Sequence, residues 1–378
     1  RRRICEEIES RIFIPFESRR WQWEELENNW SAVIAGCIGM TSLSILPKDS
    51  PRQARILKRL EHAFQRYLHS FTSDGVCEEG VSYWVYGFGY YLYFAEKYQS
   101  VYQDNRYLAD PQLLEIAAFP YRVQLGEERF VPFSDAHAHQ VLPSGLLSFC
   151  HENFQVPVPM VNRAPSVHFD HCYRWAHLYR NLNWTKGITE TPHSSVHFFP
   201  EAEWFVIKEL DFLFAAKGGR NNVSHNHNDV GHFLIGSADD IFLTDLGAGE
   251  YTRDYFLEET RYEILNNRSL GHSVPVVNGY EQEAGPGGAK QTNHQLEKEG
   301  MYLFEMDISA TYPEQANLQS LRRTWQIHAK EKKVILTDLF SFTNEEQHHI
   351  QQNFVSYLKP EVWKDKIYWQ GKKNACQL

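Results

Sequence analysis

The period of the apolar residues changes near Trp204, and this change constrains the fold more than any other feature of the chain. Before it, apolar residues recur at spacings of three or four, as over residues 56–71, which is typical of helices. After it come short β-rich runs such as Phe212-Leu213-Phe214 and Val334-Ile335-Leu336, separated by turns. We therefore expect a helical N-terminal part and an antiparallel β-sandwich in the C-terminal part.

The helical part has no strand-like runs between its helices, which favours a helical array or toroid. Ser50-Pro51 predicts an N-cap followed by proline at the first helical position. The length of 378 residues suits two or three domains of roughly 150 residues each. The expected organisation is a toroid part over 1–155, an irregular linker over 156–200 and a β-sandwich domain over 201–378.

Composition excludes several classes of protein. The net charge of −10 argues against nucleic acid as a partner, although an anionic substrate is compatible with positive groups concentrated in one cleft. The six cysteines are scattered without CxxC spacing and are expected to be free, mostly buried thiols. No run is long and apolar enough to span a membrane.

The chain opens without Met inside a helical pattern, so we expect it to be part of a longer polypeptide. No signal peptide is visible. The sequence leaves open a cytoplasmic, periplasmic or secreted location, and it leaves the oligomeric state open as well.

The densest chemistry lies in Ser224-His225-Asn226-His227-Asn228-Asp229, between two strand-like runs. Two histidines two residues apart on an extended segment point to one face. Asp245 and His272 follow on two further segments. Imidazoles and a carboxylate together predict a zinc site that a β-sheet assembles from separate segments.

Two clusters in the helical part also carry polar groups, Asn28-Asn29-Trp30 and the stretch 74–86. Asn29 is open to a simpler interpretation as the cap of the following helix. Tyr83 and Tyr86 are likewise open to interpretation as core aromatics on a helix.

Together these stretches resemble the heparinase II/III-like polysaccharide lyases, a mainly bacterial type that includes the related oligoalginate lyases. The strongest part of the resemblance is the ordered series over 217–231, 244–251, 261–262 and 269–272. Asn-Asn-Trp, then Asp-Gly, then Glu-Gly-x-x-Tyr add a weaker match in the helical part. The family has an N-terminal α/α toroid and a C-terminal β-sandwich. Its full-length members are longer, which implies that the toroid is incomplete here.

The family chemistry is β-elimination at a uronic acid. The enzyme removes the C5 proton, which is α to the carboxylate, and expels the group on C4, leaving a 4,5-unsaturated uronate. A neutraliser must hydrogen-bond the carboxylate as the enolate develops. A base takes the C5 proton, and an acid protonates the leaving glycosidic oxygen.

The resemblance implies a role for each matching residue. Asn29 matches the neutraliser, and Tyr83 matches the tyrosine that acts as acid and in some relatives also as base. His225 matches the histidine that acts from the β-sandwich as base or neutraliser, according to the substrate's stereochemistry. Tyr255 and Tyr262 are the candidates for a second tyrosine, and Tyr262 fits the oligoalginate lyases better. The chain departs from many relatives in one respect, because they place histidine beside or in place of the asparagine where Trp30 follows here.

His227, Asp245 and His272 match the family's zinc ligands, and the metal of the family is mainly interpreted as structural. Asp229 is expected to orient an imidazole or to cap a turn, not to bind the metal.

The remaining candidates are binding residues. Arg220, Arg253 and Arg261 are the arginines expected to contact substrate carboxylates or sulfates, with ordinary surface ion pairs as the alternative. Tyr255 is a further candidate for substrate binding. His137 and His139 repeat the His-x-His spacing, but without an evident third ligand they are expected at the surface or a cleft edge.

The sequence thus predicts a polysaccharide lyase that acts on a uronic-acid-containing glycan, glycosaminoglycan-like or alginate-like, in a cleft between the two parts. One alternative is a zinc-dependent glycan hydrolase in which the metal activates water. Another is a non-catalytic glycan-binding protein with the same architecture. The glycan itself is left open.

Overall fold

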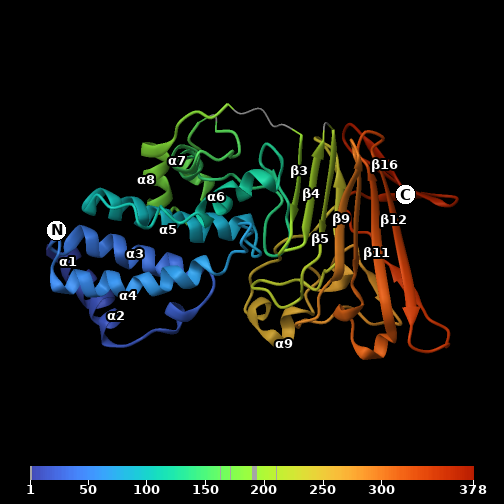
Figure 1. Ribbon diagram of the computed structural model, residues 1–378, viewed down its shortest axis with the longest axis horizontal. Coiled ribbons are helices and arrows are strands. Elements are labelled where there is room, and N and C mark those ends of the chain that lie inside the picture. Colours follow the sequence, from blue (N-terminus) through green and yellow to red (C-terminus); the bar gives the residue numbers. More distant parts are fainter. Residues whose placement is uncertain (1, 162, 171, 190–193, 210) are drawn as a thin grey trace. The chain divides into compact units, whose positions relative to one another are not determined.

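The computed structural model describes residues 2–161, 163–170, 172–189, 194–209 and 211–378. Figure 1 shows helices in the N-terminal part and the larger sheets in the C-terminal part. This order confirms the predicted mixed fold, whereas the toroid and the sandwich stay predictions. The chain forms two compact units. The helical unit comprises Arg1–Cys77, Val81–Phe119 and Val141–Glu190, and the strand unit comprises Glu78–Gly80, Pro120–Gln140 and Thr191–Leu378.

The boundaries of these two compact units differ from the domain boundaries that we expected from the sequence. Residues 120–140 belong to the strand unit, although they precede the last helices of the helical unit. The expected linker contains helix α8, Trp175–Trp184, whose buried side chains are His177, Arg180 and Asn181. Because polar residues fill the buried face of α8, no apolar period marked it in the sequence.

One helix of the described chain begins at the residue that the sequence predicted. Ser50 accepts a hydrogen bond from the Gln53 backbone N–H, and Pro51 opens the following helix, as predicted. The α-helices are α1 Arg2–Ile8, α2 Ile14–Ser18, α3 Asn29–Ile45, α4 Pro51–Leu68, α5 Val81–Tyr102, α6 Gln112–Arg122, α7 Ser144–Phe154, α8 Trp175–Trp184 and α9 Glu258–Arg261.

Asn28, not Asn29, caps helix α3. The Asn28 Oδ1 atom accepts from the Trp30 backbone N–H at 3.0 Å. Asn29 is the first helical residue and its side chain is buried. The interpretation of Asn29 as the cap is therefore wrong.

In the described part of the strand unit, two antiparallel sheets are the largest. One has the order β3-β4-β5-β6-β7 and the other β12-β11-β10-β9. Their strands are β3 Ser195–Phe199, β4 Trp204–Glu209, β5 Phe212–Lys217, β6 Phe233–Gly236, β7 Ile241–Leu243, β9 Lys290–Lys298, β10 Met301–Asp307, β11 Leu318–His328 and β12 Lys333–Phe342. The smaller sheets pair β1 Gln124–Gly126 with β2 Arg129–Phe130, β8 Pro275–Val277 with β13 Ile350–Gln352, and β14 Pro360–Trp363 with β15 Lys366–Gln370 and β16 Ala375–Gln377.

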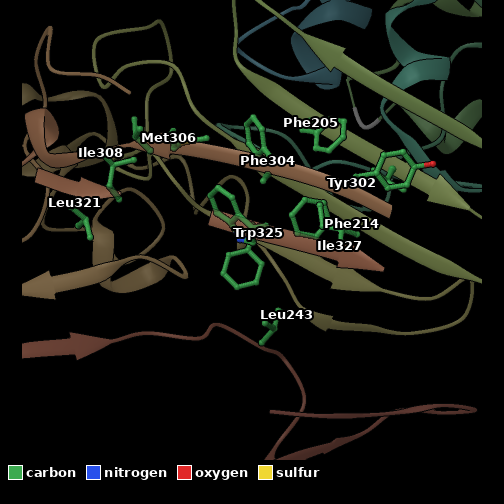
Figure 2. Close-up of a cluster of buried hydrophobic side chains, with 14 of the residues drawn as sticks. Phe205, Phe214, Leu243, Tyr302, Phe304, Met306, Ile308, Leu321, Trp325 and Ile327 are labelled. Atoms are coloured by element: carbon green, nitrogen blue, oxygen red, sulfur yellow. The ribbon is translucent and has the colours of Figure 1, made fainter. Parts of the chain in front are cut away.

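Aromatic side chains from the two large sheets share one core (Figure 2). Phe205 of β4 lies 5.3 Å from Phe304 of β10 between ring centroids, and Phe214 of β5 lies 6.4 Å from Trp325 of β11. Strand β10 alternates between buried and partly exposed residues, so one of its faces supplies the core. Strand β5 is buried along its whole length, so its opposite face is covered too.

The segment 120–140 packs on the other side of the first sheet. The Phe133 ring meets Trp204 edge-on at 5.1 Å between centroids. The Ala136 carbonyl accepts a hydrogen bond from the Ala248 backbone N–H. At Gly247, φ is +61°, and an added Cβ would lie 2.2 Å from the Ala136 oxygen, so glycine is required there. This close approach brings Asp135 beside the segment that carries Asp245.

No described helix is both long and apolar enough to cross a bilayer. The cysteines are free thiols, as predicted. They are not mostly buried, however, because only Cys77 and Cys150 are buried, whereas Cys37 and Cys172 are exposed. Both exposed thiols lie in the helical unit.

Candidate active site and metal centre

The two histidines of the dense polar stretch lie in the loop from β5 to β6. Its ends are joined by two backbone hydrogen bonds, from the Lys217 N–H to the His232 carbonyl and from the Gly231 N–H to the Lys217 carbonyl. The buried Arg323 of β11 donates from Nη1 to the carbonyls of Gly231 and Ser273, at 2.9 and 2.7 Å. Asp338 accepts from the same guanidinium. Arg323 therefore ties the segments around His232 and His272 to the second sheet.

The structure brings the three predicted metal ligands together. One ligand atom each of His227, Asp245 and His272 lies within 4.8 Å of the others, and all three side chains are buried. The Nε2 atom of His227 faces Asp135 Oδ1 at 2.9 Å, and that of His272 faces the Asn266 carbonyl at 2.8 Å. Since both partners only accept, each ring carries its proton on Nε2 and a lone pair on Nδ1.

These lone pairs point into the centre of the group. The Nδ1 atoms of His227 and His272 and Oδ2 of Asp245 are buried without a hydrogen-bond partner among the described residues. The other Asp245 oxygen accepts from the Gly247 backbone N–H at 2.7 Å. Imidazoles whose second nitrogen donates to an oxygen are the usual metal-binding arrangement. The three residues therefore fit a zinc ion.

The electrostatics of the group favour a positive charge. Despite burial, which acts in the opposite direction, the neighbouring His272 holds the pKa of Asp245 below its usual range. Conversely, despite burial, Asp245 raises the pKa of His272. The Asp245 carboxylate that favours a proton on His272 would equally attract a cation between these side chains. The charge of the site therefore fits a metal ion, as its donor atoms do.

Asp229 lies at the edge of this group. Its Oδ1 accepts from the buried Lys217 ammonium at 2.6 Å. Its Oδ2 lies 3.9 Å from His272 Nδ1, beyond hydrogen-bond distance. Asp229 thus pairs with a lysine and does not hydrogen-bond an imidazole.

His232 is a buried histidine of this centre that the sequence did not reveal. Its Nδ1 accepts from the Ser273 backbone N–H at 2.8 Å, so the neutral ring carries its proton on Nε2. Burial lowers the pKa of His232 to about 3 and keeps it neutral. That Nε2 lies 3.3 Å from Asp245 Oδ2. His232 therefore turns its Nε2–H toward the carboxylate without forming a hydrogen bond, and it is not a further ligand.

Asp135 is the second residue that sequence reasoning missed. It is 1% exposed and accepts from both histidines of the stretch, from His225 Nδ1 at 2.6 Å and from His227 Nε2 at 2.9 Å. Tyr255 and Arg261 also donate to it. Although burial acts to raise it, these hydrogen bonds and charges hold the pKa of Asp135 well below its usual range. No spacing rule marks this carboxylate in the sequence, although it lies just before the His-x-His pair at 137 and 139.

His225 lies at the exposed end of this network, where its side chain is 19% exposed. Its φ of +56° is uncommon for a residue other than glycine and is a strained conformation of the kind found at functional sites. The ring is thus presented at the surface of the strand unit with its Nδ1 fixed.

Tyr255 and Arg261 do not have the geometry expected of substrate-binding residues. Tyr255 is fully buried, and its hydroxyl donates to Asp135. Burial and the adjacent carboxylate raise the pKa of Tyr255 and keep the phenol protonated. The Arg261 side chain is 12% exposed and donates to Asn226, Tyr255 and Asp135. Both residues hydrogen-bond within the strand unit, and their contact with a glycan stays a prediction.

Other strand-unit candidates are accessible. Tyr262 is half-buried, and its hydroxyl is 3.4 Å from the Asn226 side-chain amide. Arg220 and Arg253 are exposed. His137 and His139 are exposed as well, in line with the prediction of a surface position.

Asn29 and Tyr83 belong to the helical unit. Asn29 is buried at the start of α3, and Tyr83 is half-buried in the first turn of α5. Tyr86, one turn later, stacks under the Arg174 guanidinium at 4.9 Å and edge-on against Tyr90.

Comparison with known proteins identifies the strand unit. The sequence model of the heparinase II/III-like C-terminal family matches residues 191–368. A crystal structure of heparinase III is similar, with a TM-score of 0.65 and 15% identity over 92% of this chain and 53% of that one. Heparan sulfate lyase HepC from Pedobacter heparinus gives 0.61 and 13% over 91% and 50%. No curated protein matches this sequence.

At these identities the likeness shows a shared fold, and this chain spans about half the length of those proteins. The resemblance noted in the sequence is confirmed. The region 191–368, which carries the candidate metal centre and His225, belongs to the heparinase II/III-like C-terminal family.

Proposed function

We propose that this protein is a polysaccharide lyase that cleaves a uronic-acid-containing glycan by β-elimination. The observation that carries the proposal is His225, partly exposed and held by Asp135 within a domain of the heparinase II/III-like family. The names of the similar structures, heparinase III and heparan sulfate lyase, favour a heparan-sulfate-like glycan over an alginate-like one.

The proposed mechanism gives roles to residues of both the helical unit and the strand unit. The Asn29 amide hydrogen-bonds the uronate carboxylate and lowers the free energy of the developing enolate. The Tyr83 phenol delivers its proton to the leaving glycosidic oxygen. His225 takes the C5 proton or assists in neutralising the carboxylate, according to the configuration at C5. Tyr262 is the proposed second tyrosine, and Arg220 a proposed contact for sulfate or carboxylate.

The zinc ion would be held by His227 and His272 through Nδ1 and by Asp245 through Oδ2. When bound, zinc supplies a fixed positive charge that joins three loop segments. A structural role is favoured because the three side chains are at most 1% exposed. The same burial disfavours a hydrolase, which needs substrate access to the metal. The proposed fold remains an α/α toroid followed by a β-sandwich.

A panel of glycans tests the proposal. The full natural protein is incubated with heparan sulfate, heparin, hyaluronan, chondroitin sulfate and alginate, and ultraviolet absorbance reports the unsaturated uronate. We expect a rise with heparan sulfate that His225→Asn abolishes and His139→Asn, at an exposed histidine outside the site, leaves intact. New reducing ends without absorbance would contradict elimination. Binding without either signal would favour a glycan-binding protein.

A further inference from the structure

Asp135 receives hydrogen bonds on both of its oxygens, and the two oxygens serve different parts of the site. Oδ2 accepts from His225 Nδ1 at 2.6 Å. Oδ1 accepts from His227 Nε2 at 2.9 Å and from the Tyr255 hydroxyl. Arg261 Nη2 lies 3.4 Å from each oxygen. A single buried carboxylate thus lies between the partly exposed histidine and the metal-facing one.

This arrangement determines the tautomers of both rings. An ionised carboxylate only accepts hydrogen bonds, so each histidine must donate to it. His225 then carries its proton on Nδ1, and its Nε2 bears the lone pair. His227 carries its proton on Nε2, and its Nδ1 bears the lone pair that faces Asp245 and His272. The two rings are held as opposite tautomers by one side chain.

We propose that Asp135 is a positioning residue that orients His225 and the His227 metal ligand at once, so that metal occupancy and the orientation of the His225 ring are linked. The role assigned to His225 rests on the proposed lyase function, whereas the shared carboxylate does not. A metal held at His227 Nδ1 would polarise that ring and strengthen its Nε2–H bond to Asp135. Asp135 is then fixed more firmly, and the His225 ring with it.

The isosteric variant Asp135→Asn is expected to change the tautomer of His225 but not that of His227. The amide has an oxygen that accepts and an NH₂ group that donates, so it cannot accept from both rings. Three donors meet at the Oδ1 position (His227, Tyr255 and Arg261), whereas two meet at Oδ2. The amide oxygen is therefore expected at the Oδ1 position, with its NH₂ group facing His225. His225 must then accept at Nδ1 and carry its proton on Nε2, while His227 keeps its tautomer.

The experiment uses the full protein labelled with ¹⁵N-histidine and loaded with zinc. Nitrogen shifts and two-bond couplings show which ring nitrogen carries the proton, and a His225→Gln spectrum assigns the His225 signals. In Asp135→Asn we expect the His225 proton to move to Nε2 and zinc content to stay near that of the wild type. If the glycan assay succeeds, turnover should fall by about 10⁴-fold, the size of effect known for a histidine locked in the wrong tautomer.

Asp240→Asn is the matched control, because Asp240 is also a buried carboxylate of the strand unit but caps backbone N–H groups at Lys372, Lys373 and Asn374. It should leave both tautomers unchanged. If Asp135→Asn also leaves both rings as in the wild type, the proposal is overturned.

Two measurements on the wild type keep the proposal testable even if the variant does not fold. The His225 proton must lie on Nδ1 and the His227 proton on Nε2, and the opposite assignment of either ring would refute the shared carboxylate. Removing zinc with a chelator should shift or broaden the His225 signals, and unchanged signals would refute the linkage. Neither readout needs turnover, so a failed lyase assay would not be confused with a failure here.

Discussion

The two compact units hold their candidate site residues in different ways. In the strand unit, His225 and His227 come from a loop and are fixed by hydrogen bonds to Asp135, which is distant in sequence. In the helical unit, Asn29 and Tyr83 each lie in the first turn of a helix, α3 and α5, so helix position places them. We infer that changes around the metal centre of the strand unit affect stability and metal binding, whereas loss of the Tyr83 hydroxyl in the helical unit affects chemistry.

Tyr83→Phe should have the largest effect, and it tests the helical side of this comparison. Removing the proposed acid is expected to lower kcat by about 10²–10⁴-fold, because general acid catalysis contributes that much. The melting temperature should stay unchanged. Tyr86→Phe, one turn along α5, is the matched variant and should keep near-normal turnover. Normal turnover in Tyr83→Phe would remove this residue from the mechanism.

Arg323→Met tests the strand side. The variant removes the Arg323 guanidinium from the carbonyls of Gly231 and Ser273 and from the Asp338 carboxylate, which keeps only the Gln352 amide as a donor among the described residues. Breaking a buried ion pair in this way costs about 3–5 kcal/mol. Chemical denaturation should show this loss together with weaker zinc retention. Arg322→Met, at the exposed neighbouring position on β11, should change little. Equal effects in the two variants would show that Arg323 does not support the loops.

Removal of zinc should lower the stability of the strand unit more than that of the helical unit. A ligand present at a thousandfold excess over its Kd stabilises a fold by about 4 kcal/mol, which corresponds to a drop of roughly 10 °C in Tm for a domain of this size. Calorimetry with and without chelator measures the change. If stripping abolished turnover in a protein of unchanged Tm, and added zinc restored it at once, the hydrolase alternative would be favoured.

Lowering the pH should destabilise the helical unit through His177. We expect this to be the smallest of the four predicted effects. Burial lowers the pKa of His177 to about 4, whereas an unfolded chain has about 6.5. The unfolded state therefore binds the proton first as pH falls below 6.5, and stability decreases down to the folded pKa. Between pH 7 and pH 5 the loss is about 2 kcal/mol. His177→Gln should reduce the dependence of the free energy of unfolding on pH, and the exposed His137→Gln should not. An unchanged pH dependence in His177→Gln would contradict the assignment.

Helices and strands, which depend on residues adjacent in sequence, were predicted better than contacts between residues far apart in sequence. The start of α4 follows from Ser50 and Pro51, and the strand runs follow from local apolar patterns. The ligands His227, Asp245 and His272 were predicted from their residue types and from the family resemblance, and the structure brings them together. Asp135 and His232 were missed because the fold of the backbone, and not the sequence around them, brings them beside the predicted metal ligands. Helix α8 was missed because its buried face is polar.

The central claim is that the glycan is split by elimination. The most direct test is the mass balance of products from a heparan sulfate oligosaccharide of defined length, measured by mass spectrometry. Elimination adds nothing to the substrate, so the account predicts two product masses that sum to the substrate mass, with the unsaturated end on one of them. A sum heavier by one water would show hydrolysis and would contradict the account.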